Sequence, residues 1–192
     1  MVAEILVTWF SRSGSTEKAA RALAQRLGAD VAPIVTPVPY RGMRGFARGL
    51  WDSVRHRRPQ IAIAADPTQY RLVVVGCPVW AGRPAAPLHT FLRRYGPRLR
   101  GLAAFCVSGS GAAYDGVFAE IADLAGHRPL ATLSLAEREV TSGEAATSLT
   151  AFAGVLREAL DLTVFKTGLD RPAGWRVDGP MPPERHEPHP AP

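Results

Sequence analysis

Short apolar runs and amphipathic segments alternate along most of the chain. The runs typical of β-strands lie at residues 3–10, 30–35, 72–75, 102–107 and 130–135. Segments with helical spacing lie between or after them, at residues 16–27, 43–55, 87–95, 117–125 and 145–160. Such alternation predicts a parallel sheet with right-handed crossovers and helices on both faces, a three-layer α/β/α architecture. Five strands fit a doubly wound sheet of order 2-1-3-4-5 better than a six-stranded dinucleotide-binding sheet.

One compact domain is expected to fill residues 1–162. Of the 192 residues, 46% are hydrophobic, which is enough for a sizeable core. Seven of the 17 prolines lie between residues 172 and 192, so residues 163–192 are predicted to form an extended or disordered tail. No apolar run reaches the roughly 18 residues of a membrane helix, and the N-terminus lacks the features of a secretory signal. We therefore expect a cytoplasmic protein without a membrane partner.

The strongest functional signal is a hydroxyl-rich loop between the first strand and the first helix. Its residues are Ser11, Arg12, Ser13, Gly14, Ser15 and Thr16. A phosphate here would meet the free amides and the positive dipole end of the helix, with hydroxyls as further donors. An ordinary serine cap is the alternative, but four hydroxyls in six residues exceed what a cap requires. The P-loop lysine and the G-x-G-x-x-G series are both missing.

A second loop is expected after the third strand, at residues 76–84. Its central residues are Pro78, Val79, Trp80, Ala81 and Gly82. It lies at the carboxyl edge of the sheet beside the topological switch point, where open α/β sheets bind ligands. Trp80 offers a broad π face for an aromatic ring system, or simply packs over the sheet edge.

A third loop follows the fourth strand and is rich in small residues. Its candidate binding residues are Ser108, Gly109, Ser110, Gly111 and Tyr114. Small side chains there would admit one edge of a flat ligand, and Tyr114 would stack on it or lie against the next helix. A Gly/Ser turn is common at this position, so this loop gains weight only together with the other two.

The first loop resembles the FMN-phosphate loop of the flavodoxin family, and residues 78–82 resemble that family's Pro-Val-Trp-Ala-Gly loop beside the flavin. The resemblance covers about residues 3–160 and implies a flavodoxin-like fold with non-covalent FMN. It also implies that amides near Ala81 and Gly82 contact the flavin at N5. The chemistry would then be centred on the flavin, with no catalytic side chain and no metal. The implied function is electron transfer, by a carrier or a small oxidoreductase.

Two further functions remain open at this point. An NAD(P)H-dependent quinone reductase of the same fold needs room beside the flavin, although no separate nicotinamide motif is present. A thiol phosphatase is suggested by Cys77 and Arg83, whose spacing matches an anion loop in which a thiolate attacks phosphorus. Pro78 and Pro84 remove two backbone donors from that loop and count against it. The default for Cys77 and Cys106 is a pair of reduced, buried thiols.

The formal net charge of +6 is partly concentrated in one segment. Its basic residues are Arg41, Arg44, Arg48, Arg55, Arg57 and Arg58, against the single acid Asp52. This segment is a candidate docking site for an acidic redox partner protein or for the phosphates of NADPH, and a solvated helix face is the alternative. Nucleic acid is not an expected partner. His89 and His127 lack an acidic neighbour in the sequence and are predicted to be surface or loop histidines.

Overall fold

The computed structural model describes residues 4–37, 40, 45, 47, 51 and 58–167, and the side chains of these residues up to 161. Its strands are β1 Ile5–Trp9, β2 Asp30–Pro33, β3 Leu72–Trp80, β4 Arg83–Pro84, β5 Leu102–Ser108 and β6 Thr132–Ala136. Five of them form a parallel sheet in the order β2-β1-β3-β5-β6, and β4 pairs antiparallel with the end of β3. The predicted doubly wound order 2-1-3-4-5 is therefore confirmed.

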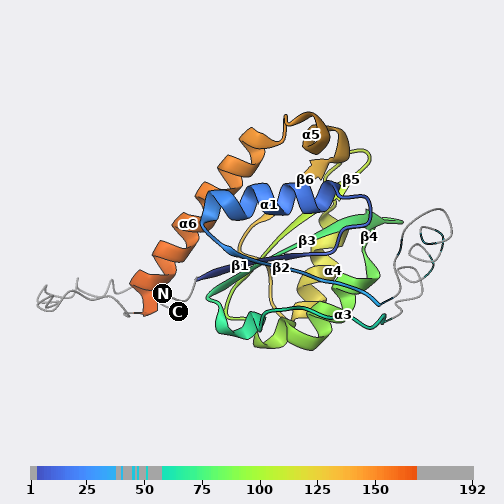
Figure 1. Cartoon of the computed structure of the whole chain (residues 1–192). Coiled ribbons are helices and arrows are strands. Elements are labelled where there is room, and N and C mark those ends of the chain that lie inside the picture. The colour runs from blue at the N-terminus through green and yellow to red at the C-terminus, as the bar shows by residue number, and fades with distance from the viewer. Residues whose placement is uncertain are drawn as a thin grey trace, which may run out of the picture.

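Helices cover both faces of the sheet, as Figure 1 shows. They are α1 Ser15–Leu27, α3 Ala86–Tyr95, α4 Asp115–Ala125, α5 Glu137–Ser142 and α6 Ala146–Thr167, with 3₁₀ turns at Pro67–Gln69 and Gly96–Arg98. One core joins α1, α5 and α6 to Val7, Val74 and Phe105 of the sheet. The other joins α3 and α4 to Leu6 and Val73. Successive strand residues thus serve opposite cores, and the sheet is buried on both faces.

The observed elements differ from the predicted ones in three places. β3 continues to Trp80, so most of the predicted second loop at residues 76–84 is strand and hairpin. α5 was not predicted, because its six residues are too few for a helical period to show. α6 extends to Thr167, past residue 160, where the last predicted helix ends.

Two expectations fall outside the described part of the chain. The predicted helix at residues 43–55 and its arginines belong there, apart from isolated residues and Arg58, and so does the predicted tail from residue 168. Both cysteines are free and buried, as expected. Within the described residues, no helix combines the length and apolar character needed to cross a membrane.

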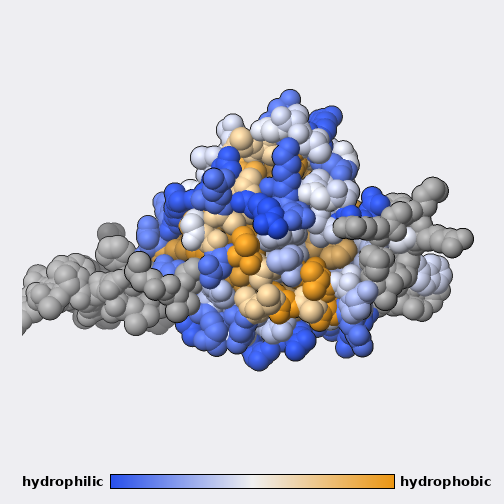
Figure 2. All heavy atoms as spheres, in the orientation of Figure 1, coloured by the Kyte–Doolittle hydropathy of each residue, from blue (hydrophilic) through white to orange (hydrophobic). Residues whose placement is uncertain are grey.

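The surface on the side of α1 and β2 is mixed. In Figure 2 hydrophilic atoms cover much of α1, and hydrophobic atoms gather over the β2 edge of the sheet below it. Val31 and Val35, at and just beyond this edge strand, are 45% and 51% exposed. The three predicted binding loops lie at a different boundary, at the carboxyl ends of β1, β3 and β5.

Candidate functional site

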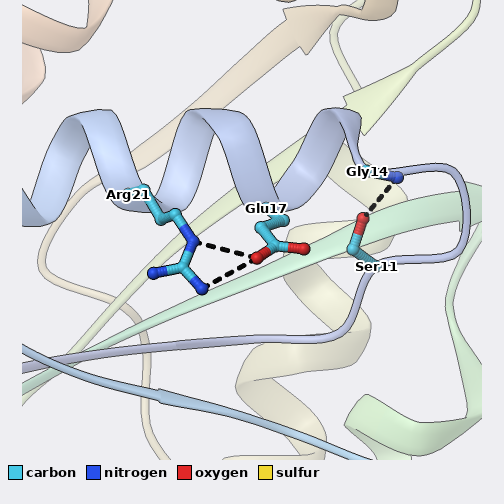
Figure 3. Close-up of polar contacts among 4 residues, drawn as sticks. All are labelled: Ser11, Gly14, Glu17 and Arg21. Carbon is cyan, nitrogen blue, oxygen red and sulfur yellow. Dashed lines mark hydrogen bonds and ion pairs between the residues drawn. The ribbon is translucent and has the colours of Figure 1, made fainter.

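The first loop is closed on itself by a backbone-to-hydroxyl contact. Gly14 N–H donates to Ser11 Oγ at 3.1 Å (Figure 3). Gly14 has φ 101°, a left-handed conformation that a residue with a Cβ rarely adopts, and it caps α1 without a side chain. The N–H groups of the first helical turn are therefore directed at the mouth of the loop, where the helix dipole is positive. Phosphate binding by this loop stays a prediction, and the structure shows the helix start and the glycine on which it rests.

Acidic Glu17, in the first turn of α1, is turned along the helix toward Arg21. Nε and Nη2 of Arg21 both contact Oε1 of Glu17, each at 2.9 Å (Figure 3). Both side chains are partly exposed, so the pair contributes little to stability. It nevertheless offsets the negative charge of Glu17 next to a loop whose chemistry favours anions.

Two hydroxyls of the loop contact a carboxylate that lies 124 and 122 residues further along the chain. Ser13 Oγ donates to Glu137 Oε1 at 3.0 Å, and Ser15 Oγ donates to the same atom at 2.8 Å. Glu137 is the first residue of α5, directly after β6. Lys18 reinforces this junction by donating from Nζ to the Thr141 carbonyl of α5 at 2.9 Å. Sequence reasoning missed Glu137, although its place directly after the last strand puts it at the same sheet edge as the three loops.

The predicted second loop is a tight β-hairpin. β3 and β4 pair through Val79 with Pro84 and Trp80 with Arg83, leaving only Ala81 and Gly82 in the turn. Both turn residues have positive φ, 50° and 72°, as a two-residue hairpin of type I′ requires. Pro78 is tolerated in this strand because pairing with β1 ends at Gly76, so β3 has a single parallel neighbour there.

Trp80 is packed into the protein. Its side chain is 4% exposed. Its ring lies 5.6 Å from the Phe10 ring in an edge-to-face arrangement and 5.5 Å from the Tyr40 ring at 50°. These contacts make Trp80 part of the core on the α3 and α4 side of the sheet. A stacking role for Trp80 stays a prediction, and the structure adds a packing role to it.

The third loop is held by its own hydroxyls. Gly111 N–H donates to Ser108 Oγ at 3.0 Å, and the Ser110 and Tyr114 hydroxyls lie 2.9 Å apart. Tyr114 also packs against the core below α4, which corresponds to the alternative in which it lies against the following helix. The loop is therefore ordered by internal contacts around small side chains.

The three loops meet at one cavity of about 170 Å³. Its lining residues are Arg12, Ser13, Ser15, Pro78, Val79, Trp80, Val107, Ser108, Gly109 and Glu137. A larger cavity of about 470 Å³ lies on the β2 side of the first loop and shares Arg12 and Ser13 with the first. The convergence expected from the strand order is therefore present among the described residues.

Other predicted site residues lie around this cavity and do not line it. Ser11 and Gly14 line the larger cavity on the β2 side, and Thr16 is buried in the first turn of α1. The remaining predicted residues outside the smaller cavity's lining are Ala81, Gly82, Ser110, Gly111 and Tyr114. They occupy the hairpin turn and the far end of the third loop.

The surface or loop position predicted for His89 is wrong. His89 is 1% exposed, and its Nε2 lies 3.3 Å from Glu120 Oε1. Arg83 Nη1 contacts the same oxygen at 3.1 Å. The packing of α3 on α4 brings these residues together, which their separation in the sequence concealed. This polar cluster ties the β4 arm of the hairpin to α4.

These features define a class of protein: an open, doubly wound α/β domain with a hydroxyl-rich loop after its first strand and two further loops at the switch point. A family model described as Flavodoxin matches residues 4–124, more than half of the chain. The chain belongs to the flavodoxin family.

Solved structures share the fold at low sequence identity. A flavoprotein from Lactobacillus acidophilus, solved in complex with FMN, is 21% identical, with a TM-score of 0.59 over 73% of this chain and 98% of that one. A WrbA-like flavodoxin from Agrobacterium tumefaciens is 15% identical, with a TM-score of 0.51 over 83% and 98%. A Fusobacterium nucleatum flavodoxin bound to flavin mononucleotide is 9% identical, with a TM-score of 0.50 over 81% and 97%. None of the curated proteins matches the chain.

Proposed function

We propose that this chain binds FMN non-covalently at the three-loop cavity and transfers electrons through the flavin. Membership of the flavodoxin family supports the cofactor. The observation that carries the proposal is the cavity itself, which brings Ser13 and Ser15 of the phosphate loop together with Trp80 and Ser108 of the two ring loops. When bound, FMN supplies one- and two-electron redox chemistry that no side chain provides.

The residues present fit the phosphate end of the cofactor well. The α1 amides, the loop hydroxyls and Arg12 would hold the phosphate, because hydrogen bonds to a charged group contribute about 1.5–3 kcal/mol each. The hairpin and the third loop would border the ring. A cavity of 170 Å³ is smaller than the ~300 Å³ at the lower end of ligand sites, so part of the flavin would lie outside it, along the open rim.

An electron carrier and an NAD(P)H-dependent quinone reductase remain the two versions of this proposal. A carrier needs only the flavin and a docking surface. The holoprotein, reduced photochemically and then mixed with an electron-acceptor protein, should pass on its electrons while oxidising NADPH no faster than free FMN does. Rapid NADPH oxidation with a quinone present would instead assign the reductase function.

The thiol phosphatase receives no support from the site. Cys77 is fully buried, and burial, followed by the neighbouring Cys106, raises the pKa of its thiol far above the ordinary value. Arg83, the residue expected to clamp the phosphate, contacts Glu120. A raised pKa keeps the thiol neutral at physiological pH, whereas the phosphatase reaction needs a thiolate.

This gives a direct prediction for cysteine reactivity. In the folded protein at about pH 8, an aromatic disulfide reagent should leave Cys77 unmodified, because the thiol is both buried and protonated. In denaturant both cysteines should react rapidly. Rapid modification of Cys77 in the native protein, together with aryl phosphate hydrolysis lost in Cys77→Ser, would restore the phosphatase.

The docking of an acidic redox partner on the segment from Arg41 to Arg58 remains part of the proposal. Its support is the local charge excess in the sequence. Electron transfer to such a partner should slow as ionic strength rises, because salt screens attraction between surface charges. A cytoplasmic location remains a prediction from the sequence.

A further inference from the structure

Glu137 places a negative charge beside Ser13 and Ser15, in the loop proposed to hold the flavin phosphate. A single oxygen, Oε1, accepts hydrogen bonds from Ser13 Oγ at 3.0 Å and from Ser15 Oγ at 2.8 Å. Each hydroxyl has one hydrogen, and because the two hydroxyls also lie 3.0 Å apart, their hydrogens are shared between Glu137 and the contact between the two serines. Neither hydroxyl can donate to a phosphate while it donates to Glu137.

The contact is built into the fold. α5 starts at the end of β6 and packs against α1, and Val140 of α5 lies in the same core as Ala19 and Leu23 of α1. Glu139 fixes the start of α5, because its carboxylate accepts a hydrogen bond from Ala136 N–H at 3.1 Å. The first residue of α5 is thereby held over the N-terminus of α1, and Glu137 lines the same cavity as Arg12, Ser13 and Ser15.

We propose that Glu137 is a specificity-determining residue that competes with the 5′-phosphate of the flavin for the Ser13 and Ser15 hydroxyls. The inference rests on the proposed function. A phosphate monoester carries close to two negative charges at neutral pH, so it is repelled by the carboxylate as well as deprived of its two donors. Riboflavin, which lacks the phosphate, escapes both effects. Glu137 therefore narrows the preference for FMN over riboflavin.

The charged groups around Glu137 do not cancel this effect. Arg12 lines the cavity with it, and Lys18 donates to the Thr141 carbonyl of α5. These cations attract the phosphate as well as the carboxylate, but they leave the Ser13 and Ser15 hydroxyls in contact with Glu137 and do not remove its charge from the loop. Among the acids nearby, Glu17 faces Arg21 and Glu139 faces a backbone amide. Glu137 is the acid that faces the loop hydroxyls.

The test is the ratio of riboflavin Kd to FMN Kd, measured by quenching of flavin fluorescence at about pH 7.5, where the phosphate is mostly doubly ionised. Glu137→Gln removes the charge and keeps an acceptor, and Glu137→Ala removes both. Glu158→Gln, an exposed acid on α6, is the charge-matched control. We expect Glu137→Gln to raise the ratio about fivefold to tenfold through tighter FMN binding, as suits one partly exposed charge, and Glu137→Ala to raise it at least as much. Glu158→Gln should leave the ratio unchanged.

The outcomes distinguish a failure of this inference from a failure of the proposed function. If wild type binds FMN and the ratio does not rise in either Glu137 variant, Glu137 merely links α5 to α1 and the inference is wrong. A change confined to the urea midpoint, with the ratio constant, has the same meaning. If wild type and variants bind neither flavin, the proposed function fails and the inference falls with it. Should one variant not fold, the other still decides the ratio.

Discussion

The loop at residues 11–16 and the hairpin at residues 78–83 border the same cavity by different physical means. The first loop presents hydroxyls and helix amides, and its polar groups contact one another or Glu137. The hairpin is held by packing: Trp80 lies against Phe10 and Tyr40, and Arg83 contacts Glu120. One half of the site is therefore shaped by charge and hydrogen bonding, whereas the other depends on the packing of the core beneath it. Substitutions in the first loop should therefore change the affinity for FMN relative to riboflavin, whereas substitutions in the hairpin should lower the free energy of unfolding.

The largest expected effect is that of Trp80→Ala. Truncating a tryptophan that is 4% exposed removes its contacts with Phe10 and Tyr40 and leaves a cavity, at a cost of about 3–5 kcal/mol in the free energy of unfolding. Affinity for FMN and riboflavin should fall together, because neither the loss of the ring nor the loosened hairpin involves the phosphate. Urea unfolding and flavin titration of the same preparation measure both quantities.

Trp80→Phe is the matched control, since it keeps an aromatic ring in the core. It should cost clearly less stability than Trp80→Ala. A Trp80 variant with weakened flavin binding and wild-type stability would contradict the packing role of the hairpin, because Trp80 would then act through direct contact with the ligand alone.

Removing hydroxyls from the first loop should have a smaller and more selective effect. In the double variant Ser13→Ala, Thr16→Val, FMN affinity should fall about tenfold to hundredfold in total, the equivalent of one hydrogen bond to the charged phosphate, because Ser13 gives up its hydrogen bond to Glu137 when it donates to the phosphate. Riboflavin affinity should change by less than about twofold, and the free energy of unfolding should change little, since Ser13 is exposed and valine keeps the shape of Thr16.

Fluorescence titration with both flavins gives the result directly. Equal losses for FMN and riboflavin would mean that the phosphate is held elsewhere. The loop at residues 11–16 would then not differ from the hairpin in how its substitutions affect the binding of the two flavins.

The smallest effect is expected in the hairpin turn, where neighbouring residues should respond with opposite signs. A Cβ added at Gly82 meets nothing within 4 Å, so Gly82→Ala costs only the strain of its positive φ, about 1 kcal/mol. Ala81 already has φ 50°, so Ala81→Gly relieves a similar strain in the folded state. Part of this gain in stability is offset because glycine increases the conformational entropy of the unfolded chain. Thermal unfolding should show Tm lowered by the first change and unchanged or slightly raised by the second. Equal destabilisation by both would contradict the positive φ at Ala81.

Much of the fold could be predicted because the evidence for it is local. The apolar run at residues 72–75 is fully buried in the middle of the sheet, as its composition indicates. The helix α1 begins one residue before its predicted start, and its buried residues fall at the expected spacing. The loop at residues 11–16 stands out in the sequence for the same reason, since its hydroxyls, glycine and helix start are consecutive.

The features that could not be predicted join residues far apart in the chain. Glu137 meets Ser13 and Ser15 only because β6 and α5 return to the N-terminus of α1. His89 is buried against Glu120 only because α3 packs on α4. The hairpin looked like a loop because Pro78 and Gly82 usually interrupt strands, and its pairing is possible only where β1 has ended. The position of Glu137 directly after the last strand indicates the sheet edge at which it lies, but the spacing of residues does not show which side chains meet there.

The most direct test of FMN binding is a titration of the flavin-free protein with FMN, monitored by visible absorption and flavin fluorescence. Binding at a single site, with quenched emission and weaker binding of riboflavin, is the predicted result. An absence of FMN binding by the folded protein would contradict the account, because the three loops would then serve the fold alone or bind another anion.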